Sequence, residues 1–411
     1  MYRRDRGRFW HHSGVPRFEP FAALRYSSGL PLADVTAPPY DVLSDADRAA
    51  LAGRHPQNVV KIDVPVEVDG PNRYNIAGEL MCDWIGSGVL VQDRSASFYR
   101  YTMTFVDEAG GEHTTVGVLG GLEVRAAGSG EVLPHEQTTP KAKSDRLDLT
   151  RSTGTNLSAV WGLSLAPGIG SIIAAADATL IGSFVDDQGV GHTLERIDAP
   201  DAIATIQTAI EAEPVVIADG HHRYEIARIF RAERQAEGAV TGRHDLTLTF
   251  IVELAPEHLF VQAIHRLLTD IPDGTDLAGV LSEFFTYSDA GAVSTATLQH
   301  MTEAGALCLV HPDGTGTYLH PRPEAFSGER DLDTARLERA LESVTHTKTY
   351  QHGVDHILHA VTSGKAQYGV LLRPVPITEI ERTAHEGLLM PPKSTFFAPK
   401  PKTGMVFRQA R

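Results

Sequence analysis

The pattern of hydrophobic and polar positions predicts strands and helices mixed irregularly along the chain. Apolar residues cluster or alternate as in strands at 97–106, 113–124, 158–165, 191–197 and 246–254. Helical spacing occurs at 74–85 and 201–212, and Ser44 stands where a helix N-cap is expected. The β-branched segment 59–64 (VVKIDV) is predicted to be a further strand. Together these patterns predict an α+β fold.

The same pattern divides the chain into four parts. We expect residues 1–16, which are basic and lack hydrophobic periodicity, to form a flexible arm, and residues 17–270 to form the main core. A composition break at 269–276 precedes an accessory α+β region at 271–345, and residues 346–411 form a strand–helix segment that returns to the core. Within the core, residues 128–156 are polar, and a long polar stretch of this kind is either functional or disordered.

Charge and composition narrow the classes of function. The chain has 37 Lys and Arg against 52 Asp and Glu, a net charge of −15, which disfavours a nucleic-acid partner. Two cysteines cannot form a disulfide framework. There is no secretory signal and no apolar run of about 18 residues, so we expect a cytoplasmic protein without a membrane partner. A homodimer is left open.

The segment 215–230 (VVIADGHHRYEIARIF) carries the most specific chemistry. An apolar strand is followed by a turn at Asp219 and Gly220, and a helix begins near His222. A helix N-terminus presents unpaired N–H groups and favours anions such as phosphate. His221, His222 and Arg223 can donate to phosphate oxygens, and Asp219 can hold Mg²⁺ against them. The alternative is that these polar residues only cap and solvate the turn.

The loop Asp219–Arg223 resembles the DGHxR loop of free serine kinases in the ParB/sulfiredoxin-like superfamily, whose sulfiredoxins carry a related Gly-Cys-His-Arg loop that holds nucleotide phosphates. From Phe18 onward the chain resembles a large prokaryotic family of unknown function. The matching segments are 37–42 (APPYDV), 135–140 (HEQTTP), 145–149 (DRLDL), 218–223 (ADGHHR), 264–268 (IHRLL) and 390–397 (MPPKSTFF). The resemblance implies a mixed-sheet nucleotide-binding core and Mg²⁺-dependent phosphoryl transfer between a nucleotide and a free amino-acid hydroxyl.

The polar stretch supplies the other candidates for this chemistry. Phosphoryl transfer to a hydroxyl needs a carboxylate that accepts the proton and cations that neutralise the moving group. We therefore expect Glu136 to be the general base, beside His135, and Lys141 and Arg146 to contact phosphate. A solvated loop with local charge pairs is the alternative interpretation.

Three further motifs supply weaker candidates. Tyr40 and Asp41 follow a rigid Pro-Pro pair that can present them to a ligand, although Pro-Pro before a helix is also ordinary punctuation. The pair His265 and Arg266 is expected to reach the same pocket, or to be a structural pair. Lys393 is a further candidate phosphate contact.

The loop and the resemblance together imply a phosphotransferase that uses Mg²⁺ and a nucleotide (ADP or ATP) and acts on a small hydroxylated metabolite. The resemblance to free serine kinases implies free L-serine as that small-molecule substrate. Two alternatives stay open. One is a small-molecule phosphatase, which needs only the phosphate site. The other is a nucleotide-gated binding protein without turnover, in which the basic arm docks onto an anionic partner.

Overall fold

The computed structural model describes residues 15–66, 70, 72–107, 110–134, 143–328 and 330–411. Its contacts divide the chain into two compact units. Unit 1 holds Met1–Phe105, His113–Leu259 and Pro399–Arg411, and unit 2 holds Val106–Glu112 and Phe260–Ala398. Unit 2 therefore takes over at Phe260, ahead of the composition break at 269–276. No helix in the described ranges is both long and apolar enough to cross a membrane.

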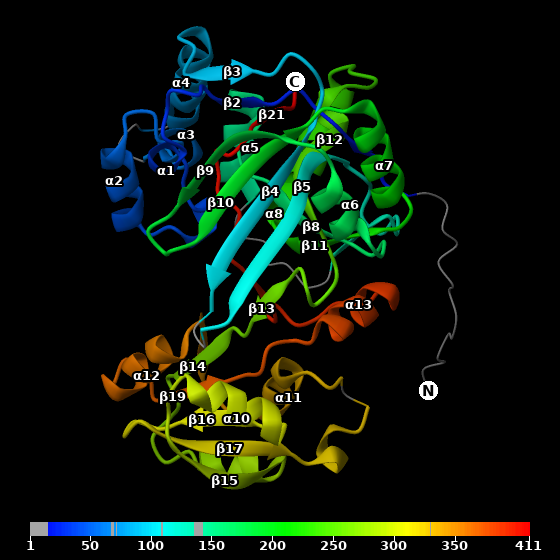
Figure 1. Ribbon diagram of the computed structural model, residues 1–411. Helices are drawn as coiled ribbons and strands as arrows, with labels where there is room; N and C mark the ends of the chain where they lie inside the picture. Colours follow the sequence, from blue (N-terminus) through cyan, green and yellow to red (C-terminus); the bar gives the residue numbers. More distant parts are fainter. Residues whose placement is uncertain (1–14, 67–69, 71, 108–109, 135–142, 329) are drawn as a thin grey trace. The chain divides into compact units, whose positions relative to one another are not determined.

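Unit 1 is built on a nine-stranded mixed sheet in the order β6-β11-β8-β12-β5-β4-β10-β9, with β1 paired to β5 (Figure 1). The pairs β6–β11 and β8–β12 are parallel, and the pairs β1–β5, β4–β10, β9–β10, β8–β11 and β5–β12 are antiparallel. The strands are β1 (Phe18–Glu19), β4 (Phe98–Val106), β5 (Glu112–Glu123), β6 (Val132–Pro134), β8 (Val160–Ser164), β9 (Thr179–Val185), β10 (Gly191–Ile197), β11 (Val215–Asp219) and β12 (Leu246–Glu253). Two small two-stranded sheets pair β2 (Leu24–Tyr26) with β3 (Leu90–Gln92) and β7 (Thr155–Asn156) with β21 (Arg408–Gln409).

Helices cover this sheet and build a second apolar cluster beside it. Ile169, Ile173, Ile206 and Ile210 of α6 and α7 pack with the inner residues of the strands. A separate cluster joins α2, α3 and α4 to β2 and β3. The helices of unit 1 are α1 (Leu32–Val35), η1 (Tyr40–Val42), α2 (Asp45–Arg54), α3 (Val60–Asp63), α4 (Arg73–Gly86), α5 (Lys143–Thr153), α6 (Ile169–Ala175), α7 (Pro200–Ile210), α8 (His221–Ala236) and η4 (Arg243–Asp245).

Unit 2 contains a six-stranded antiparallel sheet in the order β15-β17-β16-β19-β14-β18. Alternate residues of β16 enter different cores, because Leu307 and Leu309 lie in one buried cluster and Cys308 and Val310 lie in another. The strands of unit 2, of which β13 and β20 form a separate pair, are β13 (Phe260–Gln262), β14 (His265–Thr269), β15 (Phe285–Ala292), β16 (Leu307–Val310), β17 (Thr315–Pro321), β18 (Thr347–Gln351), β19 (Tyr368–Leu371) and β20 (Phe396–Ala398). Its helices are α9 (Leu277–Ser282), α10 (Ala296–Ala304), η5 (Pro323–Phe326), α11 (Asp333–Ala340), α12 (Val354–Thr362) and α13 (Ile377–His385).

Most of the predicted elements are confirmed, and so is the mixed α+β class. Ser44 caps α2 through a reciprocal pair of hydrogen bonds with Asp47. The strand predicted at 59–64 is wrong, because these residues form the short helix α3. Burial decides the conformation there, since Val60 and Ile62 are fully buried among helices and the Asn58 side chain accepts from the Val60 N–H. The polar stretch 128–156 also contains the helix α5, which the sequence did not indicate.

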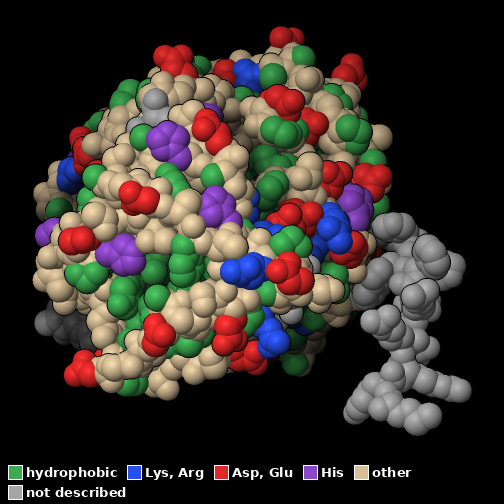
Figure 2. Space-filling model, turned by 90° about the horizontal axis from the view of Figure 1, so that it is seen from below, with side chains coloured by type: hydrophobic (Ala, Val, Ile, Leu, Met, Phe, Trp, Pro, Cys, Tyr) green, Lys and Arg blue, Asp and Glu red, His purple; other side chains and the backbone are tan. Residues whose placement is uncertain are grey.

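On the face shown in Figure 2, Asp and Glu side chains are spread widely among hydrophobic and histidine side chains, and Lys and Arg side chains are fewer. This distribution accords with the net charge of −15.

Candidate functional site

The strand–turn–helix predicted around Asp219 is present in unit 1. The buried strand β11 ends at Asp219, Gly220 adopts a left-handed conformation with φ of 84°, and α8 begins at His221. A Cβ atom at position 220 would lie 3.0 Å from Arg223 Nε and 3.3 Å from Val160 Cα. Both the φ angle and the close packing therefore favour glycine at this position. The first turn of α8 consequently follows the end of β11 after a single residue. His221 and His222 lie half-buried at the N-terminus of this helix.

Both oxygens of the Asp219 carboxylate accept hydrogen bonds from cations. Arg223 Nη2 donates to Oδ2 at 2.6 Å, and Lys400 Nζ donates to Oδ1 at 2.5 Å. Arg223 is fixed further by donating from Nη1 to the Ala159 carbonyl. Burial alone would raise the pKa of Asp219, but the charges of Lys400 and Arg223 outweigh it and hold this pKa well below its usual range. Asp219 is therefore ionised and organises two cations at the start of α8.

Tyr40 and Asp41, which follow the Pro-Pro motif, lie near Arg223. Asp41 Oδ2 lies 3.9 Å from Arg223 Nη2, and the Arg146 guanidinium lies over the Tyr40 ring at 4.1 Å from its centroid. Burial raises the pKa of the Tyr40 hydroxyl, and the positive charges of Arg223 and Arg146 oppose this shift. The candidates Tyr40, Asp41 and Arg146 thus join Asp219 and Arg223 in one charged cluster, although the motifs lie far apart in sequence.

Arg146 also connects the cluster to a buried carboxylate. Its Nη1 donates to the Asp63 carbonyl oxygen at 2.6 Å and to Asp63 Oδ1 at 3.2 Å, and its Nη2 donates to Asp145 Oδ2 at 2.9 Å. Asp63 Oδ2 is buried and has no hydrogen-bond partner within the described ranges. Burial raises the pKa of Asp63, while Arg146 and Arg223 lower it. A buried carboxylate oxygen without a partner is costly, so a water or ligand at this position is favoured.

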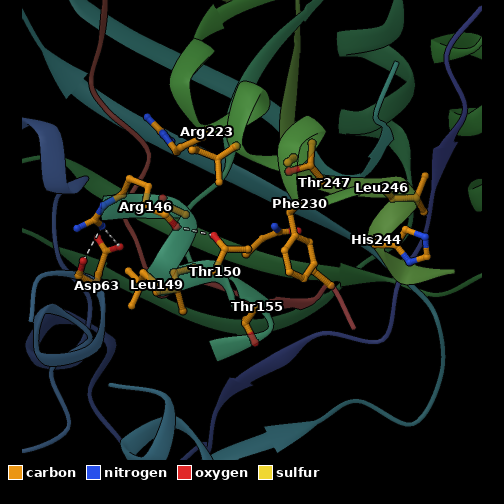
Figure 3. Close-up of a pocket in the computed structure, with 16 residues that line it drawn as sticks. Asp63, Arg146, Leu149, Thr150, Thr155, Arg223, Phe230, His244, Leu246 and Thr247 are labelled. Carbon is orange, nitrogen blue, oxygen red and sulfur yellow. Dashed lines mark hydrogen bonds and ion pairs between the residues drawn. The ribbon is translucent and has the colours of Figure 1, made fainter. Parts of the chain in front are cut away.

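A small cavity borders this cluster (Figure 3). Asp63, Arg146 and Arg223 line it together with Phe230 and His244, and its volume is about 50 Å³. That space holds a few water molecules and is too small for a nucleotide. A nucleotide at this site would therefore have to lie outside the cavity, against the exposed side of the α8 N-terminus.

The remaining candidates are distributed as follows. His135, Glu136 and Lys141 lie outside the described residues. His265 and Arg266 are the first residues of β14 in unit 2, and both are buried. Their contribution to a phosphate site, like that of Lys393, stays a prediction.

Arg266 links two of the matching motifs within unit 2. Its guanidinium donates to the Ile264 carbonyl at 2.5 Å and to the Lys393 carbonyl at 3.1 Å, and it lies over the Tyr350 ring at 4.7 Å. Lys393 has a left-handed φ of 60°, which presents that carbonyl. The segments 264–268 and 390–397 thus contact each other, and a structural role for Arg266 is evident.

A metal ion would depend on Asp219. In the part of the chain that the structure describes, no group of three or more His, Cys, Asp or Glu side chains is placed to hold a metal ion. Mg²⁺ is commonly held by one or two carboxylates together with substrate phosphates, so a single carboxylate beside a phosphate site fits such a shared site. The fit involves competition, because Lys400 already donates to Asp219 Oδ1.

Two members of the cluster, Lys400 and Asp63, are not among the residues that the sequence predicts for the site. Lys400 stands in the segment APKPK just after the 390–397 motif. The two lysines of this segment are the sequence feature that could have indicated a phosphate contact. The sequence pattern predicts a strand at 59–64, and this prediction places Asp63 on a strand and not at the end of a helix. Its burial at the end of α3 has no sequence signal of its own.

These features define a mixed α+β protein in which Arg223 and Lys400 surround the Asp219 carboxylate at the N-terminus of a helix. The chain belongs to the family described as "Protein of unknown function (DUF1015)", whose model matches residues 18–344. No curated protein matches the chain.

Three solved structures to which the chain is similar are a conserved hypothetical protein from Pyrococcus furiosus, a free serine kinase in complex with AMP, and SbnI with a C-terminal truncation from Staphylococcus aureus. The Pyrococcus protein is 12% identical, with 67% of this chain and 90% of that chain covered and a TM-score of 0.35. The kinase is 13% identical, with 67% and 88% covered and a TM-score of 0.35. SbnI is 12% identical, with 69% and 85% covered and a TM-score of 0.37.

Proposed function

We propose that the protein is a phosphotransferase that moves a phosphoryl group between ADP or ATP and a small hydroxylated metabolite, with free L-serine as the acceptor. The observation that carries this proposal is the charged cluster at the start of α8. There Arg223 and Lys400 are held by one ionised carboxylate, at the N-terminus of the helix α8. Such an arrangement suits phosphate oxygens, whose negative charge both features favour.

In this proposal each residue of the loop has a distinct task. Gly220 lets the phosphates approach the backbone, and His221, His222 and Arg223 donate to their oxygens. Asp219 orients Arg223 and Lys400 through its two oxygens. Asp41 places a second carboxylate near Arg223, and Arg146, which stacks over the Tyr40 ring, is a further phosphate contact.

The reaction also needs a proton acceptor and charge neutralisation. Glu136 takes the proton of the attacking hydroxyl, with His135 beside it in sequence, and Lys141 adds positive charge. Asp219 is the residue that would hold Mg²⁺, which when bound neutralises charge on the moving phosphoryl group. Lys400 supplies part of that neutralisation from the protein itself.

Phosphorus NMR of the full chain with Mg²⁺, ADP and O-phosphoserine tests the proposal, because ATP and inorganic phosphate give separate resonances. Growth of the ATP signals is the expected result. The variants Asp219→Ala and Arg223→Gln should abolish it, whereas Arg228→Gln, on the same helix and paired with Glu225, should not. Inorganic phosphate without ATP would favour a phosphatase instead. An unchanged spectrum, or full turnover in Asp219→Ala and Arg223→Gln, would exclude this serine kinase mechanism.

A further inference from the structure

Unit 2 contains a second cavity that the proposed phosphoryl transfer does not use. Its volume is about 590 Å³, within the range of roughly 300–1,000 Å³ typical of small-molecule sites. Phe260 and Leu298 contribute apolar walls, and Gln262 and Gln299 contribute amide groups. An apolar wall with a few polar groups is the usual composition of a site for a small organic ligand.

A buried histidine provides the cavity with an oriented hydrogen-bond donor. His265 lines the cavity and is only 2% exposed. Its Nδ1 accepts a hydrogen bond from the Leu372 N–H at 3.1 Å, which assigns the ring proton to Nε2. Burial, followed by the charges of Arg266 and His352, lowers the pKa of His265 to about 4, so the ring is neutral at pH 7. Within the described ranges no residue accepts from Nε2, so this donor is available to a ligand.

The charge of the lining restricts what can bind. Among the described residues that line the cavity there is no Lys or Arg, and Asp107 is the one with a charged side chain. Phosphates and carboxylates would lose their hydration without gaining a cation, which disfavours them. This cavity therefore differs in its charge from the cluster around Asp219, Arg223 and Lys400 in unit 1.

We propose that this cavity is a binding site for an uncharged small molecule that has an apolar body and a carbonyl or similar acceptor. The acceptor takes the hydrogen bond from His265 Nε2, and the apolar body packs between Phe260 and Leu298. The proposal does not depend on the phosphotransferase activity, since it concerns a separate cavity and a ligand without phosphate.

The probe for this site is benzamide, with benzoate as the control of the same shape but with a negative charge. Saturation-transfer NMR on the full chain should show millimolar binding of benzamide and at least tenfold weaker binding of benzoate. The ¹⁵N-detected Nε2–H resonance of His265 should shift with benzamide. Equal affinity for both probes, or no benzamide binding up to 10 mM (roughly the weak limit for a ligand of this size), would overturn the proposal.

Two variants on α10 locate the binding without disturbing the buried histidine. Thr302 is exposed and lines the cavity, so Thr302→Tyr should fill it and reduce benzamide binding at least tenfold. His300 is exposed on the same helix and is not among the lining residues, so His300→Tyr should bind benzamide as the unmodified protein does. Unchanged binding in Thr302→Tyr would place the probe elsewhere and refute the assignment.

Discussion

Lys400 and Asp219, 181 residues apart in sequence, form an ion pair in which the ammonium group donates to Oδ1 at 2.5 Å. Arg223 holds the other oxygen of the same carboxylate. The segment that follows β20 thereby supplies a cation to the loop that follows β11. A metal ion bound to Oδ1 of Asp219 would have to compete with this lysine.

The first prediction concerns this competition. Lys400→Met should increase the affinity for Mg²⁺ at least fivefold in the absence of nucleotide, because it frees Asp219 Oδ1 and removes a repelling charge. Calorimetric titration with Mg²⁺ measures it. Lys402→Met is the matched control, since Lys402 pairs with Asp186 instead. Equal Mg²⁺ affinity in both variants would show that Asp219 is not the metal ligand.

The second prediction concerns the left-handed turn. Gly220→Ala should lower the free energy of unfolding by about 1–2 kcal/mol and weaken ADP binding at least tenfold, because φ of 84° and the contact with Arg223 both oppose a Cβ atom. Gly238, with φ of 95° and open space around its Cβ position, provides the control. Gly238→Ala should lose about 1 kcal/mol and keep its ADP affinity. Urea denaturation and calorimetry measure the two effects, and unchanged ADP binding in Gly220→Ala would contradict the assigned role of the loop.

The third prediction separates catalysis from binding. Glu136→Gln should lower turnover at least a hundredfold while leaving ADP affinity within twofold, because the amide can neither accept the proton of the serine hydroxyl nor return it when phosphoserine is the donor. The rate of ATP formation from ADP and O-phosphoserine and the calorimetric ADP affinity are measured side by side. Turnover that survives in Glu136→Gln would remove this residue as the base.

The elements around Asp219 could be predicted from sequence because the signals there are local. An apolar run, a glycine and an amphipathic helix follow one another within 215–230, and β11, Gly220 and α8 occupy those places. The segment 59–64 shows the opposite case. Its β-branched residues favour a strand. The side chains of Val60 and Ile62 are nevertheless fully buried on a helix that packs among other helices, so burial does not require a strand here.

The site itself could be predicted only in part. Asp219 and Arg223 are only four residues apart, and the left-handed turn at Gly220 between β11 and α8 brings their side chains together. Lys400 and Asp63 join them through the path of the chain in three dimensions, which a single sequence does not encode locally. The contact of Tyr40 with Arg146 likewise depends on the three-dimensional path of the chain. Both residues are candidates from the sequence, but nothing in the sequence indicates that they stack.

The last prediction concerns acid stability and a buried network in unit 1. His192 Nδ1 lies 2.8 Å from the Tyr101 hydroxyl, and its Nε2 lies 3.2 Å from Asp186 Oδ2. Burial lowers the pKa of His192 to about 4, with Asp186 opposing the shift and Lys402 adding to it. In the unfolded chain this histidine has an ordinary pKa near 6.5. Between pH 6.5 and 4 the unfolded chain therefore binds a proton at His192 that the native state does not bind.

Stability should accordingly be full above pH 6.5 and fall as the pH drops towards 4, by up to about 3 kcal/mol from His192 alone. In His192→Gln this contribution disappears, so the loss of unfolding free energy between pH 7 and pH 5 should be smaller by about 2 kcal/mol. Urea denaturation at the two pH values measures it. The exposed His300 serves as the control, because His300→Gln should keep the full dependence. His265, whose pKa is also lowered to about 4, contributes equally to all three proteins and cancels in the comparison. If His192→Gln loses as much stability as the unmodified protein, the histidine is not buried in its neutral form.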